Sequence, residues 1–369
     1  MQIRTVETFL VSSSLRKPFI TALRTVHTVQ SVIIKLTTDN DLIGWGEAVP
    51  THVITGDSIG GIRHVIDHVL APLLVGQDIR RLELLTERMQ RAIIGNTGAK
   101  AAVDMAVNDL FGQLCGLPLV HVLGGYRQSL KTDLTVSVGK PADMAKEAAD
   151  HVARGFDTLK VKVGTSSSQQ ERERIHAVRQ TVGPDILIRL DANQGWKPKE
   201  AIHLIRQLED DGVDLELIEQ PVAAYDVEGL RDVTRQTSTL IMADESLFSA
   251  RDAKRLLEMR AVDVLNIKLM KSGGIREALK INALAEANGV ECMVGSMMET
   301  AVGVTAAAHI AASQPNITRV DLDAPLLLAE EFSAGGVLYH GSHMEFSKKS
   351  GLGFDSKRMM QWVKEHACE

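Results

Sequence analysis

The amino-acid sequence predicts an α/β fold, in which a TIM-type (β/α)7β barrel follows an N-terminal α+β capping domain. Residues 1–49 alternate apolar and polar side chains, which is typical of strands with one buried face. Residues 57–115 then show a helical period, which is clearest at 99–114. From residue 126 onward, short apolar runs alternate with polar helical stretches, and this pattern indicates a parallel barrel.

The first part of the chain is expected to form a three-stranded antiparallel sheet. Its strands are predicted at 3–11, 29–36 and 42–48, with a turn at 39–41 between the last two. The segment 15–28 is expected to be a loop, and loops of this kind are where related proteins differ in specificity. Together with the helices that follow, this sheet predicts a capping domain over residues 1–125.

Eight apolar runs predict the barrel strands, and the seven polar stretches between them predict its helices. The runs lie at 134–138, 157–163, 186–191, 215–220, 240–244, 263–268, 291–296 and 319–323. After Asp323 the sequence is rich in Pro- and Gly-containing turns and shows no eighth helical stretch. We therefore expect the barrel domain over residues 126–325 and a segment at 326–369 that returns to the capping domain.

The composition matches an ordinary soluble protein, with 44% apolar and 24% charged residues. A formal net charge of −6, without a Lys- or Arg-rich block, argues against a nucleic-acid partner. The three cysteines are scattered, the first residues lack a signal peptide, and no apolar run approaches the roughly 18 residues that span a bilayer. We expect a cytoplasmic homo-oligomer that acts on a small molecule and binds neither nucleic acid nor a membrane.

Five charged residues each close one apolar run, in the order Lys162, Asp191, Glu219, Asp244 and Lys268. Their numbers differ by 29, 28, 25 and 24, which is about the length of one strand plus one helix. Because the carboxyl ends of barrel strands surround one pocket, these side chains are expected to meet there. Three adjacent carboxylates need a cation, and oxygen ligands alone favour Mg²⁺. The alternative for any single acid is a helix cap or a surface ion pair.

The lysines suggest the chemistry of this pocket. Lys160 and Lys162 are two residues apart, so both are expected on the strand face that points into the barrel mouth. A nearby like charge lowers a lysine pKa, which favours a free amine base. Lys268 belongs to the sixth predicted strand, across the barrel axis from the second. Two amines on opposite sides of one carbon let a proton leave by one face and return by the other, which inverts that carbon.

At these positions the chain resembles the enolase superfamily, and within it the muconate-lactonizing subgroup. The matching motifs are K-V-K at 160–162, D-A-N at 191–193, E-Q-P at 219–221, A-D-E-S at 243–246, K-L-M at 268–270, G-W-G-E-A at 44–48 and L-G-G at 123–125. The resemblance implies an enediolate, stabilised by Mg²⁺ on Asp191, Glu219 and Asp244, that forms when the proton alpha to a carboxylate is removed. It implies Lys162 and Lys268 as the two acid/base residues.

The far end of the substrate is expected to meet other charged residues. Asp321 and Asp323 end the eighth strand as a same-face pair that suits a substrate ammonium, provided that no further lysine lies nearby. Arg24 in the cap loop suits a carboxylate, although a loop arginine is more often solvated. Both features resemble the dipeptide epimerases of the L-Ala-D/L-Glu type, which implies a role in the metabolism of peptidoglycan peptides. The same resemblance implies further pocket residues at Thr135, Lys160, Ser296, Met297 and Met298.

Other functions remain open at this point. The nearest alternatives keep the site and change the substrate: a muconate cycloisomerase, an o-succinylbenzoate synthase or an N-acylamino acid racemase. None of these needs a pair of carboxylates for an ammonium. A barrel aldolase would instead use Lys162 or Lys268 as a Schiff-base nucleophile. A non-catalytic binding barrel would bind no metal and would exchange no proton with solvent.

Overall fold

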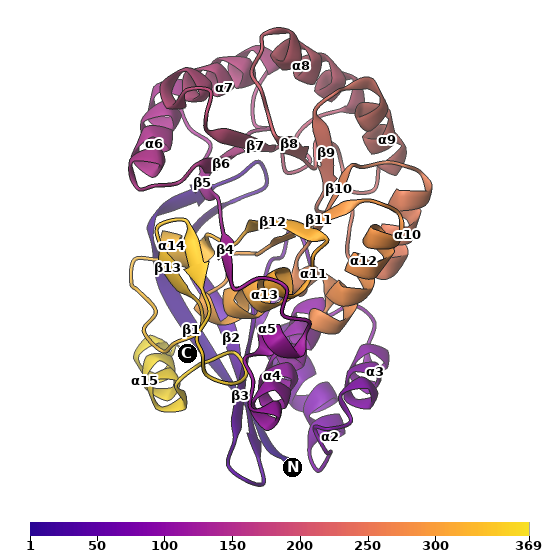
Figure 1. Ribbon diagram of the computed structural model, residues 1–369, viewed down its shortest axis with the longest axis vertical. Helices are drawn as coiled ribbons and strands as arrows, with labels where there is room; N and C mark the ends of the chain where they lie inside the picture. The colour runs from indigo at the N-terminus through magenta and orange to yellow at the C-terminus, as the bar shows by residue number, and fades with distance from the viewer. Residues whose placement is uncertain (369) are drawn as a thin grey trace.

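The computed structural model describes residues 1–368 of the chain, and Figure 1 shows their arrangement. The predicted fold class is confirmed. An eight-stranded parallel sheet with surrounding helices lies next to a three-stranded antiparallel sheet with its own helices. In the view of Figure 1 the barrel occupies the upper part, and the antiparallel sheet extends from the lower end of the molecule up to the barrel.

The capping sheet consists of β1 (Ile3–Ile20), β2 (Thr25–Thr38) and β3 (Ile43–Ala48), paired in that order. Two of these strands are longer than the alternation of side chains predicts. A series of helical segments follows the sheet: α1 (Ile59–His64), η1 (Val65–Leu70), α2 (Ala71–Leu74), α3 (Leu82–Ala92), α4 (Thr97–Cys115) and α5 (Leu119–Val122).

The prediction of a loop at 15–28 is wrong, because β1 and β2 continue through this segment as a hairpin. Ser14 pairs with Thr28, the register then shifts, and Phe19 pairs with Val26. A two-stranded ribbon is marginally stable in water by itself, so such an arm needs support from the rest of the molecule. The chain after the barrel supplies it, since the amide of Ala329 donates to the Ser14 carbonyl at 2.9 Å. Local sequence could not reveal a contact between segments more than 300 residues apart.

Two glycines in the G-W-G-E-A motif allow α4 to lie directly on the sheet. A Cβ at Gly44 would collide with the carbonyl oxygen of Ala106, and a Cβ at Gly46 would collide with that of Ala102. Glycine is therefore needed at both positions for the backbones to approach. Trp45 between them points to the other side, where it is buried in a cluster with Val302 of the barrel and Trp362 of the C-terminal helix.

All eight predicted barrel strands are present, and neighbouring strands pair in parallel. They are β5 (Leu134–Val136), β6 (Thr158–Lys162), β7 (Leu187–Asp191), β8 (Leu217–Glu219), β9 (Leu240–Ala243), β10 (Val264–Ile267), β11 (Glu291–Gly295) and β12 (Ile317–Asp321). Bonds between side chains and backbone link the two ends of this series. The amide of Leu322 donates to Thr132 Oγ1 at 2.9 Å, and the amide of Thr135 donates to Asp323 Oδ2 at 2.7 Å.

The seven predicted helices between the strands are also present, with a short additional helix after β10. They are α6 (Pro141–Ala153), α7 (Ser168–Val182), α8 (Pro198–Asp210), α9 (Val227–Gln236), α10 (Ala250–Glu258), α11 (Leu269–Ser272), α12 (Ile275–Ala287) and α13 (Ala301–Ser313). Several begin at a side-chain cap, as at Ser167, Asp226 and Ser249, where an oxygen accepts from an amide of the first turn.

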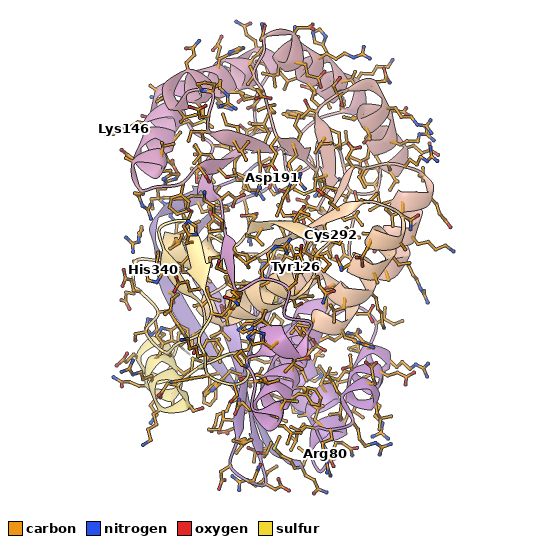
Figure 2. The ribbon with its side chains drawn as sticks, viewed as in Figure 1. Arg80, Tyr126, Lys146, Asp191, Cys292 and His340 are labelled. Carbon is orange, nitrogen blue, oxygen red and sulfur yellow. The ribbon has the colours of Figure 1, made fainter. Side chains whose placement is uncertain are left out.

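The chain after the barrel contains α14 (Ala324–Leu327), the strands β13 (Leu338–His340) and β14 (His343–Glu345), which pair with β4 (Ser129–Lys131), and α15 (Ser356–His366). The last helix lies beside β1, and the amide of Cys368 donates to the Leu10 carbonyl at 3.1 Å. Figure 2 shows Asp191 in the barrel interior and Lys146 and Arg80 at the outer surface. Within residues 1–368, no helix is both long and apolar enough to cross a bilayer.

Candidate active site

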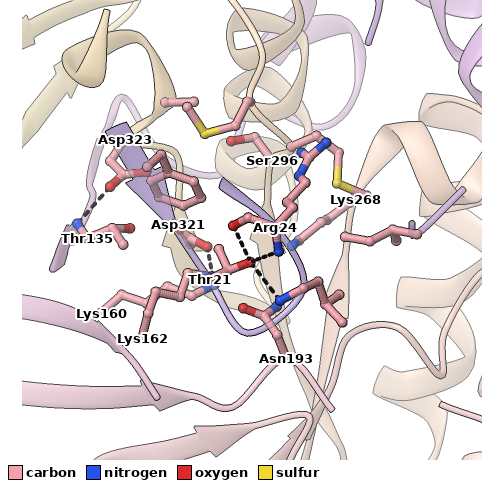
Figure 3. A pocket seen from close by; sticks show the side chains of 16 residues that line it. Thr21, Arg24, Thr135, Lys160, Lys162, Asn193, Lys268, Ser296, Asp321 and Asp323 are labelled. Carbon is pink, nitrogen blue, oxygen red and sulfur yellow. Dashed lines mark hydrogen bonds and ion pairs between the residues drawn. The ribbon is translucent and has the colours of Figure 1, made fainter. Parts of the chain in front are cut away.

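The carboxyl ends of the barrel strands and the tip of the β1–β2 hairpin enclose one pocket (Figure 3). The two lysines predicted as acid and base, Lys162 and Lys268, line this pocket. All eight residues predicted to contact substrate also line it: Arg24, Thr135, Lys160, Ser296, Met297, Met298, Asp321 and Asp323. The structure thus brings together side chains that lie almost 300 residues apart in the sequence.

Sequence reasoning missed six other residues that line the pocket: Phe19, Thr21, Leu23, Ile54, Asn193 and Ala324. The first three belong to the hairpin tip, whose orientation depends on the strand pairing that was not predicted. For Asn193 a signal was available. It stands in the D-A-N motif directly after β7, at the end of the barrel where the carboxyl ends of the strands gather.

Strand register brings the three predicted metal ligands together. Lys162 on β6 is opposite Asp191 on β7, which is opposite Glu219 on β8. Glu219 is in turn opposite Met242 on β9, so Asp244, two residues further, faces the same side. The register places the three carboxylates close together. These residues are at most 1% exposed, so water screens their charges little.

Ammonium groups compensate these charges. Lys160 Nζ lies 3.0 Å from Asp191 Oδ2, 2.7 Å from Glu219 Oε2 and 2.7 Å from Asp321 Oδ2. Lys162 Nζ lies 2.6 Å from the same oxygen of Asp191. Lys160 therefore bridges the carboxylates of three strands, and it joins the predicted metal ligands to the substrate end of the pocket.

The pKa values follow this balance of charge and burial. Burial disfavours the ammonium of Lys160, yet the negative charges of Asp191, Asp321 and Glu219 raise its pKa well above the ordinary value. Burial also opposes the charge on Lys268, whose pKa is nevertheless raised, because Asp244 lies 2.8 Å away. Like charges alone predict lowered lysine pKa values, whereas the surrounding carboxylates dominate at these two lysines. For Glu219, burial and then the charge of Asp191 raise the pKa to about 7.

The acidic side chains suit a hard divalent cation, although their orientation differs from the predicted arrangement. Within the described residues, no three acidic, histidine or cysteine side chains already share one coordination centre. Asp191, Glu219 and Asp244 face ammonium groups instead, because three buried anions need a positive charge beside them. Their oxygens are nonetheless the ligands that Mg²⁺ prefers. In this part of the chain, Asn193 Oδ1 and Glu245 Oε2 are further buried oxygens without a hydrogen-bond partner.

The two candidate bases lie on opposite sides of the barrel. Lys162 ends β6, and Lys268 directly follows β10. In the strand order, β7, β8 and β9 separate these strands on one side, and β11, β12 and β5 separate them on the other. Each amine also has its own carboxylate partner, so the two approach the pocket from separate walls (Figure 3).

The predicted ammonium site needs one correction. The prediction requires that no lysine lies near Asp321 and Asp323, but Lys160 Nζ donates to Asp321 Oδ2 at 2.7 Å. Lys160 and Asp321 meet inside the barrel, and the spacing of residues along a strand does not reveal this contact. Asp323 Oδ2 accepts from the Thr135 amide, and burial, followed by the charge of Asp321, raises its pKa to about 6. The Lys160 ammonium therefore offsets the charge of Asp321, one member of the predicted pair.

Arg24 projects into the pocket from the hairpin tip, where a compact turn holds it. Thr21 Oγ1 accepts from the amides of Leu23 at 3.2 Å and Arg24 at 3.3 Å, and the Arg24 carbonyl accepts from the Thr21 amide at 3.0 Å. Burial lowers the pKa of Arg24. Within residues 1–368 the guanidinium has no carboxylate partner. It is therefore a cation at the pocket wall that remains available to an anionic group.

Comparisons with known proteins match the whole architecture. Residues 3–124 match the N-terminal domain of the mandelate racemase / muconate lactonizing enzyme family, and residues 143–359 match the enolase C-terminal domain-like model. The L-Ala-D/L-Glu epimerase of Bacillus subtilis is 52% identical over 365 residues, which cover 99% of this chain and 100% of that protein.

Two solved structures are closely similar. The substrate-liganded complex of the Bacillus subtilis epimerase superposes with a TM-score of 0.95 at 52% identity, covering 96% of this chain and 99% of that one. The dipeptide epimerase of Enterococcus faecalis, complexed with Mg and L-Leu-L-Tyr, superposes with a TM-score of 0.93 at 44% identity, covering 96% and 100%. The chain therefore belongs to the mandelate racemase and muconate lactonizing enzyme family of the enolase superfamily.

Proposed function

We propose that this protein is a Mg²⁺-dependent dipeptide epimerase of the L-Ala-D/L-Glu type, which inverts the alpha carbon of the C-terminal residue. One observation carries the proposal: Lys162 and Lys268 face one pocket from opposite walls, and acidic residues for a cation lie between them. The full-length similarity to dipeptide epimerases supports this class of substrate.

The two lysines perform the proton transfer. One amine, in its neutral form, removes the alpha proton from one face of the substrate, and the ammonium of the other returns a proton to the opposite face. In the reverse direction the two residues exchange roles. Asp191, Glu219 and Asp244 would hold Mg²⁺, which when bound supplies positive charge to offset the negative charge on the substrate carboxylate.

Other pocket residues orient the dipeptide. Asp323, assisted by Asp321, accepts hydrogen bonds from the substrate ammonium, and Arg24 pairs with the side-chain carboxylate of a C-terminal Glu. Lys160 keeps Asp191, Glu219 and Asp321 in place and adds positive charge near the substrate carboxylate. The remaining contacts come from residues that line the pocket, namely Thr135, Ser296, Met297 and Met298.

The test is proton exchange in deuterated water. Incubation of L-Ala-L-Glu with the enzyme and Mg²⁺ should place deuterium at the Glu alpha carbon and produce L-Ala-D-Glu, as measured by NMR and chiral chromatography. Absence of exchange with every acidic and hydrophobic dipeptide tested would contradict the proposal. A Schiff-base aldolase would instead be trapped by borohydride with a carbonyl substrate and would not need Mg²⁺.

A second candidate substrate follows from the bond between Lys160 and Asp321. Because the Lys160 ammonium offsets the charge of one member of the acidic pair, a substrate without an ammonium, such as an N-acylamino acid, is the second candidate. Asp323→Asn distinguishes the two. Loss of dipeptide turnover in the variant supports the epimerase. If the wild type does not bind dipeptides and the variant still turns over an N-acylamino acid, the racemase is favoured. A cytoplasmic location, a homo-oligomeric state and a source of substrate in peptidoglycan peptides stay predictions.

A further inference from the structure

Glu47, in the G-W-G-E-A motif of β3, is buried and accepts four hydrogen bonds. Its Oε1 accepts from Ser31 Oγ at 2.6 Å and from the Thr300 amide at 2.9 Å. Its Oε2 accepts from Thr300 Oγ1 at 2.7 Å and from the Gly303 amide at 2.8 Å. Three of the four donors belong to the barrel. A carboxylate of the capping domain is thus bound to the beginning of the barrel helix α13.

This contact holds one end of a short loop that reaches the pocket. The loop runs from Ser296 to Thr300, between β11 and α13. At its start, the amide of Ser296 donates to the carbonyl of Asp321 at 3.1 Å. At its end, Thr300 is bound to Glu47 through both its amide and its hydroxyl. Met297 and Met298 lie between these two points and line the pocket.

Glu299 closes the loop from inside. Its Oε1 accepts from the Met297 amide at 2.9 Å, and its own amide donates to the Met297 carbonyl at 2.8 Å. Burial, and then the negative charge of Glu47, raise the pKa of Glu299 to about 8. Gly303 leaves room for the Glu299 side chain, because a Cβ at this position would collide with Glu299 Oε2.

The proton-transfer residues do not belong to this loop. Lys162 ends β6, Lys268 follows β10, and the candidate metal ligands end other strands. The loop instead packs against the hairpin, where Met298 shares a small apolar cluster with Val29 and Phe19. A shift of the loop would therefore move a part of the pocket wall that carries neither Lys162 nor Lys268.

We propose that Glu47 is a positioning residue, which holds the loop Ser296–Thr300 in register with the capping domain and so sets the affinity for the dipeptide. This inference rests on the proposed function, because dipeptide turnover is its measure. Removing the acceptor leaves buried amide and hydroxyl donors without a partner, which favours displacement of the loop. The expected result is a change in KM without a matching change in kcat.

The experiment compares Glu47→Gln and Thr300→Val with two controls. Thr300→Ser keeps the hydroxyl, and Asp109→Asn changes another buried capping-domain carboxylate, one that accepts from the amides of Trp45 and Leu352 outside the pocket. For Glu47→Gln and Thr300→Val we expect KM for L-Ala-L-Glu to rise about tenfold while kcat falls less than about threefold. The Mg²⁺ dissociation constant should stay at the wild-type value. Both controls should keep the wild-type KM.

The outcomes are distinct. A purely structural role would lower the melting temperature and the active fraction, so kcat would fall at constant KM in the same way as in any destabilised variant, and that result overturns the inference. If Glu47→Gln does not fold, Thr300→Val decides, since it keeps Glu47 and removes only the two bonds of the Thr300 hydroxyl, which donates to Glu47 and accepts from the Val302 amide. A wild-type protein that leaves all dipeptides unchanged overturns the proposed function, and this inference with it. Turnover by the wild type with an unchanged KM in both variants overturns the inference alone.

Discussion

Lys162 and Lys268 are held apart by two different carboxylates: Lys162 Nζ lies 2.6 Å from Asp191 Oδ2, and Lys268 Nζ lies 2.8 Å from Asp244 Oδ2. Asp191 ends β7 and Asp244 directly follows β9. Both strands lie between β6 and β10, which carry the two lysines at their ends. Each amine thus pairs with one of the candidate metal ligands. The proposed function requires such an arrangement, because it assigns the two amines to opposite faces of one substrate carbon.

Removal of either lysine should therefore separate the two directions of exchange. In Lys162→Ala, one antipode of the dipeptide should lose deuterium incorporation by about 10²- to 10⁴-fold, and in Lys268→Ala the other antipode should lose it. The measurement is NMR of L-Ala-L-Glu and L-Ala-D-Glu, each incubated separately in deuterated water. Equal exchange of both antipodes in both variants would show that the lysines are not the two acid/base residues.

Glu219→Gln should weaken Mg²⁺ binding and abolish epimerisation, because an amide oxygen carries no net charge to offset a divalent cation. Isothermal titration calorimetry with Mg²⁺ measures the first effect, and dipeptide turnover measures the second. Glu216→Gln is the matched control. Glu216 directly precedes β8 and pairs with Arg189 and Arg319. Wild-type Mg²⁺ affinity in Glu219→Gln would favour a structural role for this carboxylate.

Arg24→Met should raise KM for L-Ala-L-Glu by about 10- to 100-fold, the usual effect of losing hydrogen bonds to a charged group. Turnover of L-Ala-L-Leu should change much less, because its side chain offers no carboxylate to the guanidinium. Arg16→Met serves as the control on the same hairpin, since Arg16 Nε donates to the Leu328 carbonyl at 2.7 Å. An equal rise of KM for both dipeptides would indicate that Arg24 only shapes the hairpin.

Asp104 should make stability depend on pH. This buried side chain of α4 accepts from the Ile275 amide at 2.6 Å, and burial raises its pKa from 3.8 to about 7. The folded protein therefore binds a proton that the unfolded chain releases between these values, so this group's contribution to the free energy of unfolding falls as pH rises from 3.8 to about 7. Asp104→Asn should remove that dependence, so its melting temperature relative to the wild type should be higher at pH 8 than at pH 5. Calorimetry at the two pH values tests it, and an identical pH profile in wild type and variant would contradict the prediction.

Some parts of the candidate site could not be predicted because they depend on contacts between distant segments. The hairpin that carries Arg24 is supported by the chain near Ala329. The bond from Lys160 to Asp321 forms where the two ends of the strand series meet. The sequence shows Glu47 as part of the G-W-G-E-A motif but does not show its partners Thr300 and Gly303, which lie more than 250 residues away. In each case the missing information is a contact between segments far apart in the chain, which periodicity does not encode.

The sequence by itself determined the order of strands and helices in the barrel and the charged residues at the strand ends. Alternation along a strand and the length of each β/α unit are local properties, and the closed parallel arrangement then brings the strand ends to one rim. Tertiary structure alone decided which charges neutralise one another, how the hairpin covers the pocket and where the capping domain binds the barrel. The physical reason is that burial and pairing energies depend on distances between groups far apart in the chain, and those distances exist only after folding.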